Sequence, residues 1–242
     1  MFLDELGNRI REQREKLGLK QNDIAHALQI SPQSVSKWER GENAPDITIL
    51  PQLAKLLSVT TDWLLGRFSE NQDLFEATVF VSSIHGAYKK SLTMDARDFA
   101  SWANGIFYQL TEAVLKHDGV PIKYMGDQFL AFFSGTDHQK RSLQTALLSK
   151  KTINENLIIG LSSGEIFLGT VGHPDYSRPD IMGEVVNLAF LTMDWADTNT
   201  KSGIGATDSF VQYFDNTLSI GKKAEVNFKD IKNPVKVFEI KI

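Results

Sequence analysis

The sequence predicts two domains of different class: an all-α domain of five short helices, followed by an α+β domain. The first 66 residues hold short amphipathic segments interrupted by glycine and proline, a pattern typical of short helices. After a polar stretch near residue 70, apolar β-branched runs alternate with longer amphipathic segments, as in a sheet with helices. At 242 residues the chain is long enough for both. We place the domains at residues 1–69 and 76–242, with a linker over 70–75.

Composition narrows the possible functions. A hydrophobic fraction of 42% and a charged fraction of 23% are typical of a globular protein. The absence of cysteine excludes a disulfide scaffold and any cysteine-ligated metal site. The net charge of −4 argues against a strongly basic surface that binds nucleic acid without sequence preference. The acidic start of the chain and the lack of an apolar run of about 18 residues predict a cytoplasmic protein without a membrane segment.

The first domain has recognisable helix boundaries. A first helix is expected to end near Gly18, and a second to begin near Lys20. Ser31 suits an N-cap and Pro32 is tolerated at the first helical position, so a third helix is expected through Arg40. The remaining two are expected over residues 47–57 and in a short segment after Thr60.

In the second domain, Gly126 and Asp127 predict a hairpin turn between two apolar runs. The expected strands cover residues 77–83, 120–125, 129–133, 157–162, 165–171, 226–231 and 235–240. The expected helices cover residues 95–117, 140–150, 184–198 and 209–214.

The second and third helices have a helix-turn-helix layout. Gln21, at the start of the second helix, can donate to a phosphate oxygen where the helix dipole favours negative charge. Gln33, Ser34 and Lys37 project from the start of the third helix, where base edges of the major groove come within reach. Apolar side chains hold the two helices together, namely Ala25, Ile30, Val35 and Trp38.

The stretch from Ser31 to Gly41, with Pro45 and Asp46 beyond it, resembles the phage-repressor (Cro and cI) type of helix-turn-helix domain. The resemblance implies sequence-specific binding to double-stranded DNA, with a homodimer on an inverted-repeat operator. The residues it assigns to DNA contact are Lys20, Gln21, Gln33, Ser34, Ser36, Lys37 and Arg40. The alternative is a helical module used only for protein contact.

Charge in the first domain is balanced, because residues 1–69 contain nine Lys or Arg and nine Asp or Glu. Affinity for DNA should therefore come from a local basic patch. The candidates for this patch are Arg14, Lys20, Lys37 and Arg40. An alternative for Arg40 is a surface ion pair with Glu39 or Glu42.

Five segments of the second domain resemble class III adenylate and guanylate cyclases, in order and with suitable spacing. The resemblance implies a ferredoxin-like α+β fold, with the third segment forming two strands joined by a turn at Gly164 and Glu165. The segments are residues 77–86, 123–133, 160–172, 180–189 and 234–240.

Individual positions depart from the family. Its members hold two divalent ions with two aspartates; the second stands here as Asp127, but Ser83 occupies the place of the first. The transition-state arginine is replaced by Leu191. We therefore expect no catalytic residues, no metal site and no enzyme activity. Asp127 is expected to stabilise its own turn, and it remains a candidate ligand contact.

The residues that resemble the purine and ribose contacts persist as Lys123, Asp180 and Asn187. This pattern predicts a homodimeric transcription regulator whose cyclase-like domain senses a nucleotide, adenine-based and possibly cyclic, with no required cofactor. Arg178, Lys232 and Lys236 are candidate phosphate contacts, or else solvated surface cations. The alternatives are a purely structural dimerisation domain, in which Lys123 and Asp180 simply pair, and an active cyclase regulated by DNA.

Overall fold

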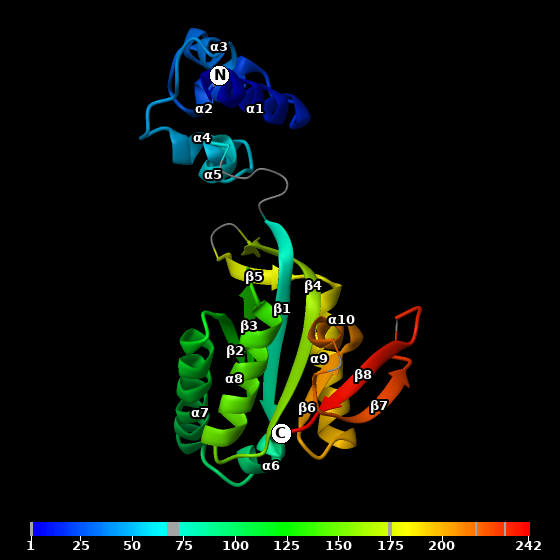
Figure 1. Ribbon diagram of the computed structural model, residues 1–242. Coiled ribbons are helices and arrows are strands. Elements are labelled where there is room, and N and C mark those ends of the chain that lie inside the picture. The colour runs from blue at the N-terminus through cyan, green and yellow to red at the C-terminus, as the bar shows by residue number, and fades with distance from the viewer. Residues whose placement is uncertain (1, 67–72, 174–175, 216, 230) are drawn as a thin grey trace. The chain divides into compact units, whose positions relative to one another are not determined.

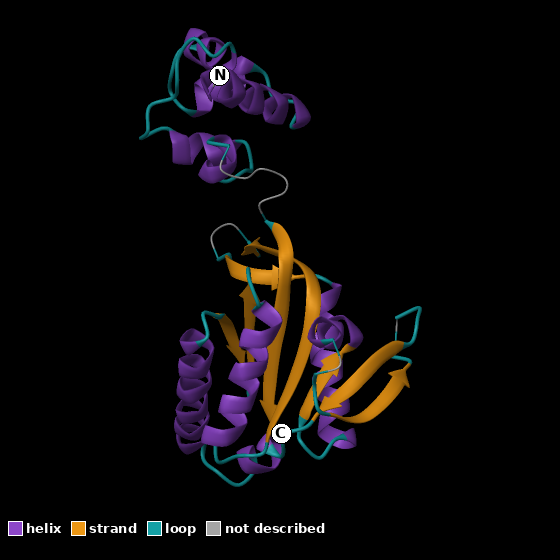
Figure 2. Ribbon diagram, in the orientation of Figure 1, coloured by secondary structure: helices purple, strands orange, loops and turns teal. Residues whose placement is uncertain are grey.

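The computed structural model describes residues 2–66, 73–173, 176–215, 217–229 and 231–242. It divides into two compact units, Met1–Gln72 and Asp73–Ile242, which we describe separately (Figure 1). Among the described residues, the first unit contains helices and no strands, and the second is a sheet with helices on both faces (Figure 2). The fold class expected for each part of the chain is confirmed.

The helices of the first unit begin at the caps that the sequence predicts. The Ser31 hydroxyl accepts a hydrogen bond from the backbone N–H of Ser34 at 3.2 Å, and the Thr60 hydroxyl accepts one from Trp63 at 3.1 Å. The fourth helix starts later than expected, because the Asp46 carboxylate binds the N–H of Thr48 at 2.8 Å and holds a turn there. The helices are α1 (Phe2–Lys16), α2 (Gln21–Ala27), α3 (Pro32–Glu39), α4 (Leu50–Leu56) and α5 (Thr61–Leu64).

A single apolar core fixes α3 against α2. Ala25 of α2 and Val35 and Trp38 of α3 are buried, and Ile30 between the helices is half-buried against them. The same core takes in Leu6, Ile10, Ile24, Leu53, Leu57 and Leu64. Because one side of α3 is committed to this core, its opposite side faces solvent.

The second unit contains a sheet of eight strands among the described residues, in the order β2-β3-β1-β4-β6-β8-β7, with β5 paired to β4. Its first six main elements run β-α-β-β-α-β with antiparallel pairing, which is the ferredoxin-like arrangement. The elements are β1 (Leu74–Ile84), α6 (Ala87–Ser91), α7 (Ala96–Lys116), β2 (Val120–Met125), β3 (Gln128–Ser134), α8 (His138–Thr152), β4 (Leu157–Val171), β5 (Arg178–Met182), α9 (Glu184–Asn199), β6 (Ile204–Thr207), α10 (Asp208–Val211), a 3₁₀ turn (Gln212–Phe214), β7 (Ile220–Val226) and β8 (Val235–Ile240).

Both faces of the central sheet are covered. Helices α7 and α8 cover one face and α9 covers the other (Figure 1). Phe80 of β1 belongs to the core that includes residues of α7 and α8, whereas its neighbours Val79 and Val81 belong to the core that includes residues of α9. Burial on both faces explains why β1 reads as an almost continuous apolar run. Gly160 of β4 lets α9 approach closely, because a Cβ atom there would lie 2.1 Å from the carbonyl oxygen of Ala189.

Several sequence expectations are wrong in detail. The expected strands 157–162 and 165–171 form one strand, β4, and Gly164 and Glu165 make no turn because they pair with Ala77 and Glu76 of β1. The strand expected at 226–231 lies earlier, as β7, and the helix expected at 209–214 is split into α10 and the 3₁₀ turn. Elements α6, β5 and β6 were not expected.

The linker is shorter at its carboxyl end than the range 70–75, because β1 already begins at Leu74. Residues 70–72 of that range lie outside the described residues, as do residues 67–69 at the end of the first predicted domain.

Candidate functional site

The exposed side of α3 carries two of the residues expected to contact DNA. Gln33 and Lys37 are exposed and stand one helical turn apart, on the side opposite the core. Lys20 is exposed just before α2 begins. Ser34 is half-buried, and its hydroxyl lies 2.9 Å from that of Ser31 in the N-cap. The exposed side of α3 thus presents Gln33 and Lys37 on a helix that the core holds in place.

Gln21 is held by a buried carboxylate. Its side-chain amide donates to Glu39 Oε2 at 2.8 Å, and Glu39 is only 2% exposed. An amide nitrogen has two hydrogens, so one remains for a phosphate oxygen. The importance of Glu39 was missed at the sequence level, although an acidic residue directly after the buried Trp38 was a usable signal.

Arg14 does not belong to an exposed basic patch, contrary to expectation. It is 9% exposed, and its Nε donates to Glu39 Oε1 at 2.6 Å. A second nitrogen of its guanidinium donates to the Leu19 carbonyl at 2.9 Å. The hydrogen bonds with Glu39 raise the pKa of Arg14 above its ordinary value. Its position on the inner face of α1 explains this role, since a buried cation requires a partner.

Arg40 forms the surface ion pair that was the alternative to a place in the basic patch. Its guanidinium is exposed and pairs with Glu42, with Nε lying 2.6 Å from Oε1. Another guanidinium nitrogen donates to the Ser36 hydroxyl at 2.9 Å. The side chains of Ser36 and Arg40 are therefore hydrogen-bonded to each other at the carboxyl end of α3.

The two residues that resemble purine contacts meet in the structure. Lys123 of β2 donates from Nζ to the carboxylate of Asp180 on β5. The other carboxylate oxygen of Asp180 accepts the backbone N–H of Ile181 at 2.9 Å. The side chain of Asp180 is 19% exposed and that of Lys123 is 39% exposed. The pair is accessible from solvent at the junction of β2 and β5.

Ser83 and Asp127, the two positions that the family resemblance matches to metal ligands, line a small pocket of about 360 Å³ at the end of β1. The carboxylate of Asp127 accepts the backbone N–H of Ile84 at 3.4 Å, so it binds β1 and not the turn it was expected to stabilise. The other carboxylate in the pocket, Asp197, lies 2.5 Å from Nδ1 of His85.

These donors do not fit a two-ion centre. Hard divalent cations require several carboxylate or carbonyl oxygens, and Ser83 offers a neutral hydroxyl. Within the described ranges, no three His, Cys, Asp or Glu side chains are grouped so that they could hold a metal ion. The carboxylate of Asp127 is left without a second acidic ligand at the position of Ser83.

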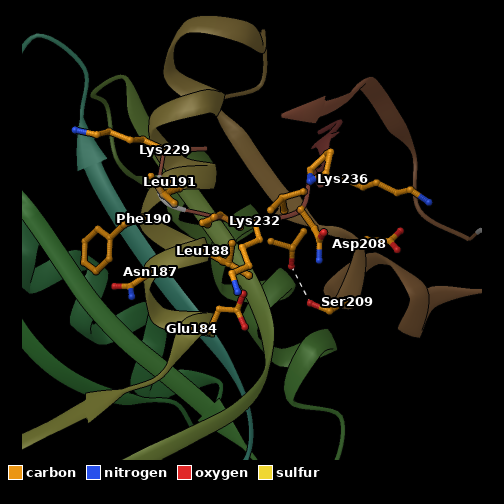
Figure 3. Close-up of a pocket in the computed structure, with 15 residues that line it drawn as sticks. Glu184, Asn187, Leu188, Phe190, Leu191, Asp208, Ser209, Lys229, Lys232 and Lys236 are labelled. Atoms are coloured by element: carbon orange, nitrogen blue, oxygen red, sulfur yellow. Dashed lines mark hydrogen bonds between the residues drawn. The ribbon is translucent and has the colours of Figure 1, made fainter. Parts of the chain in front are cut away.

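Asn187 and Leu191 lie one turn apart on α9 and both line a larger pocket, of about 1140 Å³ (Figure 3). Lys232 and Lys236, two of the candidate phosphate contacts, line it from the segment around the start of β8. Arg178 does not line it; its guanidinium lies 5.3 Å from the centre of the Tyr176 ring. Neither Lys123 nor Asp180 lines this pocket, so one chain does not gather all the expected ligand contacts around it.

Comparison with known proteins gives separate matches for the two units. The helix-turn-helix family matches residues 10–64. The HTH-type transcriptional regulator ImmR of Bacillus subtilis is 40% identical over 62 residues, which cover 26% of this chain and 49% of that protein. The HTH-type transcriptional regulator DicA of Escherichia coli is 43% identical over 60 residues, covering 25% of this chain and 44% of that one. The chain spans about half the length of these curated relatives.

The second unit is similar in fold to nucleotide cyclases of known structure. The guanylyl cyclase Cya2 superimposes with a TM-score of 0.62 and 19% identity over 69% of this chain and 92% of that one. The adenylyl cyclase CyaB from P. aeruginosa gives 0.60 and 19%, over 70% of this chain and 95% of that one. The protein thus carries a helix-turn-helix domain of the repressor type followed by a domain with the class III cyclase fold. None of the described helices has the length and apolar character needed to span a bilayer.

Proposed function

We propose that the protein is a sequence-specific DNA-binding transcription regulator whose second domain binds an adenine nucleotide without converting it. The observation that carries the first part is the exposed start of α3, where Gln33 and Lys37 stand on a helix fixed by the core. Side chains at this position of a helix-turn-helix reach base edges in the major groove. The similarity to two HTH-type transcriptional regulators supports the same proposal.

The absence of turnover follows from two positions. Ser83 leaves Asp127 without the second carboxylate that a two-ion centre needs, so the attacking hydroxyl and the phosphates have no metal to bind. Leu191 stands where the family resemblance expects the arginine that stabilises charge in the transition state. Loss of such an arginine alone costs several orders of magnitude in related phosphoryl chemistry.

Recognition of adenine is supported by the chemistry of Lys123 and Asp180. A lysine ammonium has three donors and a carboxylate several acceptor sites, so each retains capacity after pairing with the other. Lys123 can donate to a ring nitrogen of adenine, and Asp180 can accept from its exocyclic amino group. The alternative, a dimerisation domain without a ligand, is favoured by the same ion pair, because each group already neutralises the other.

The ligand would lie between two protomers of a homodimer. In one chain, the pocket containing Ser83 and Asp127 shares no lining residue with the pocket containing Asn187 and Leu191. Two copies would bring one half of the site from each protomer. A ligand in this interface would favour one protomer orientation over another and so alter the spacing of two α3 helices. That spacing must match about 34 Å, one turn of DNA.

The DNA-binding proposal is tested by selecting DNA from a random pool with the full chain, followed by measurement of affinity for the enriched sequence. We expect enrichment of an inverted repeat bound at least about a thousandfold more tightly than random DNA. If no sequence is enriched, the first unit is a protein-contact module.

The proposed lack of catalysis is tested by incubating the protein with ATP or GTP and Mg²⁺ or Mn²⁺. No cyclic nucleotide should form above background, and Ser83→Asp combined with Leu191→Arg should restore a trace. Turnover by the unaltered protein that Asp127→Ala abolishes would instead identify an active cyclase joined to a DNA-binding domain.

A further inference from the structure

The edge of the sheet at β7 and β8 carries a group of exposed lysines. Strand β7 is the last strand in the order of the sheet (Figure 1), and Lys222 and Lys223 lie on it. Lys201 lies in the turn before β6, and Lys241 directly follows β8. All four residues are exposed, and we refer to them as the lysine patch.

One buried carboxylate brings the three segments of the patch together. Glu239 of β8 accepts the backbone N–H of Lys201 at 2.7 Å through Oε1 and that of Lys222 at 3.0 Å through Oε2. The backbone N–H of Lys241, two residues beyond Glu239, donates to the Ser219 carbonyl at 2.9 Å. The turn before β6, the start of β7 and the end of β8 therefore lie beside one another.

The ammonium groups of the patch are not paired with carboxylates. Glu239 is only 8% exposed, and its oxygens accept backbone N–H groups. Lys222 donates from Nζ to the neutral side-chain oxygen of Asn199 at 2.7 Å, and Nζ of Lys223 lies 5.8 Å from the centre of the Phe238 ring. In the described part of the chain, none of the four lysines forms an ion pair. Their positive charge is therefore available to a partner.

Nearby carboxylates have other neighbours. Asp197 of α9 lies 2.5 Å from Nδ1 of His85. At 3.6 residues per turn, Asn199 projects from roughly the opposite side of the helix. Glu225, further along β7, stands opposite Lys236 of β8. Residues 73–242 contain 17 Lys or Arg and 20 Asp or Glu, so an excess of basic residues does not explain the patch.

We propose that the lysine patch binds phosphate groups of the DNA backbone, as a second DNA contact in addition to the helix-turn-helix domain. A lysine ammonium binds a phosphate as a point charge, and such a contact carries no information about base sequence. The inference rests on the proposed DNA binding of the first unit. DNA held by that unit raises the local concentration of phosphate groups around the second unit of the same chain.

Two observations separate the patch from other roles. Lysines on an edge strand discourage pairing with other sheets, which accounts for Lys222 and Lys223 but not for Lys201 and Lys241, because these lie outside β7. No residue of the patch lines either of the two pockets that form the halves of the proposed nucleotide site. Variants of the patch can consequently leave that site intact.

The test measures the affinity of the full chain for random-sequence DNA by fluorescence anisotropy at several salt concentrations. Lys201→Gln with Lys223→Gln removes two charges, and the bond from Lys201 to Glu239 persists because the backbone makes it. We expect the slope of log affinity against log salt concentration to become shallower by about 1–2, and the affinity at about 0.1 M salt to fall at least about fivefold. The matched control, Lys116→Gln with Lys140→Gln, removes the same charge from exposed residues of α7 and α8 and should change the slope by less than about 0.5.

The same lysine changes are repeated in a chain with Gln33→Ala and Lys37→Ala, which removes the proposed contacts of α3. The slope should again become shallower by about 1–2. If it does so although no DNA sequence is selected by the unaltered chain, the patch binds DNA and the proposal of sequence-specific reading fails. The inference is overturned if the lysine pair behaves like the unaltered chain or like its control while the α3 changes weaken binding, and the helix-turn-helix domain is then the DNA contact by itself. It is also overturned if the lysine pair weakens binding to vesicles containing phosphatidylglycerol and leaves DNA binding unchanged.

Discussion

Glu39 joins three elements of the helix-turn-helix domain through one buried carboxylate. It accepts hydrogen bonds from Arg14 of α1 at 2.6 and 3.0 Å and from Gln21 of α2 at 2.8 Å, while it stands at the end of α3. A buried charge that loses its partner is strongly destabilising. Glu39 therefore helps to fix the position of α3 relative to α1 and α2.

Glu39→Gln should lower the free energy of unfolding of the first unit by about 3 kcal/mol. We take the low end of the usual range because Arg14 keeps its hydrogen bond to the Leu19 carbonyl. Urea unfolding of the full chain, followed by hydrogen exchange in residues 2–66, measures the change. Glu42→Gln is the control, since it breaks the exposed pair with Arg40 and should leave stability unaltered; equal losses would show that the buried network is not the cause.

Glu239 plays a comparable part in the second unit. Its carboxylate accepts the backbone N–H groups of Lys201 at 2.7 Å, Ser202 at 3.0 Å and Lys222 at 3.0 Å. The N–H of Lys222 contributes most to a lowering of the Glu239 pKa from 4.5 to about 2. One side chain thus ties β8 to β7 and to the turn before β6.

Because the folded pKa is below the unfolded one, the stability from Glu239 is fully present above pH 4.5 and is lost as the pH falls toward about 2. Glu239→Gln should destabilise the second unit by on the order of 2 kcal/mol at neutral pH and should flatten the pH dependence over that window. Denaturant midpoints measured from pH 2 to pH 7 test this. Glu225→Gln, on the exposed side of β7, is the control and should follow the unaltered protein.

At the scale of elements, α3 is expected to divide base reading from phosphate binding. Gln33→Ala should weaken binding to the selected operator by about 1–3 kcal/mol and leave binding to random DNA unchanged. Lys37→Ala should weaken binding to both and reduce the slope of affinity against salt concentration. Anisotropy titrations at several salt concentrations distinguish the two, with exposed Lys55→Ala of α4 as control. Identical behaviour of both variants would mean that α3 does not read bases.

Packing of α9 on the sheet depends on one glycine of β4. Gly160→Ala would place a methyl group 2.1 Å from the Ala189 carbonyl oxygen. Neither the Cβ atom nor the carbonyl oxygen can rotate away, because the backbone fixes the position of each. The free energy of unfolding should therefore fall by about 1–3 kcal/mol. Gly105→Ala in α7 is the matched control, because nothing lies within 4 Å of its added Cβ. There we expect a gain of about 0.5–1 kcal/mol. Thermal unfolding of the second unit that showed no difference between the variants would contradict the close approach of α9.

The elements predicted correctly are those with strong local signals. Ser31 and Thr60 mark helix starts, and Gly126 with Asp127 marks the turn between β2 and β3. The elements predicted wrongly are strands whose extent depends on pairing with distant parts of the chain. Gly164 resembles a turn residue, yet pairing with Ala77 of β1 keeps β4 continuous. Strand β7 is polar because it lies at the edge of the sheet, so apolar patterning could not reveal it.

For the molecule as a whole, the sequence identified which residues to examine but not how they are engaged. The meeting of Lys123 with Asp180 depends on β2 and β5, two strands that are not neighbours in the chain. Composition and spacing did not indicate that Arg14 is buried. They left the pairing of Arg40 with Glu42 as one of two alternatives, and only the structure decides between them. The pocket that contains Asn187, Leu191, Lys232 and Lys236 is lined by α9 and by the segment around the start of β8, and no local sequence pattern indicates it.

The proposed function requires that an adenine nucleotide bound near Lys123 and Asp180 alters DNA binding without being converted. Its most direct test is the affinity of the full chain for its selected operator, titrated with cyclic AMP, ATP and their guanine counterparts in the absence of divalent metal. We expect an adenine ligand to shift operator affinity at least about fivefold, and its guanine counterpart to act about tenfold or more weakly. Asp180→Ala should remove the effect more completely than Asp127→Ala. A response to guanine nucleotides alone, or one untouched by changing both Lys123 and Asp180, would contradict it.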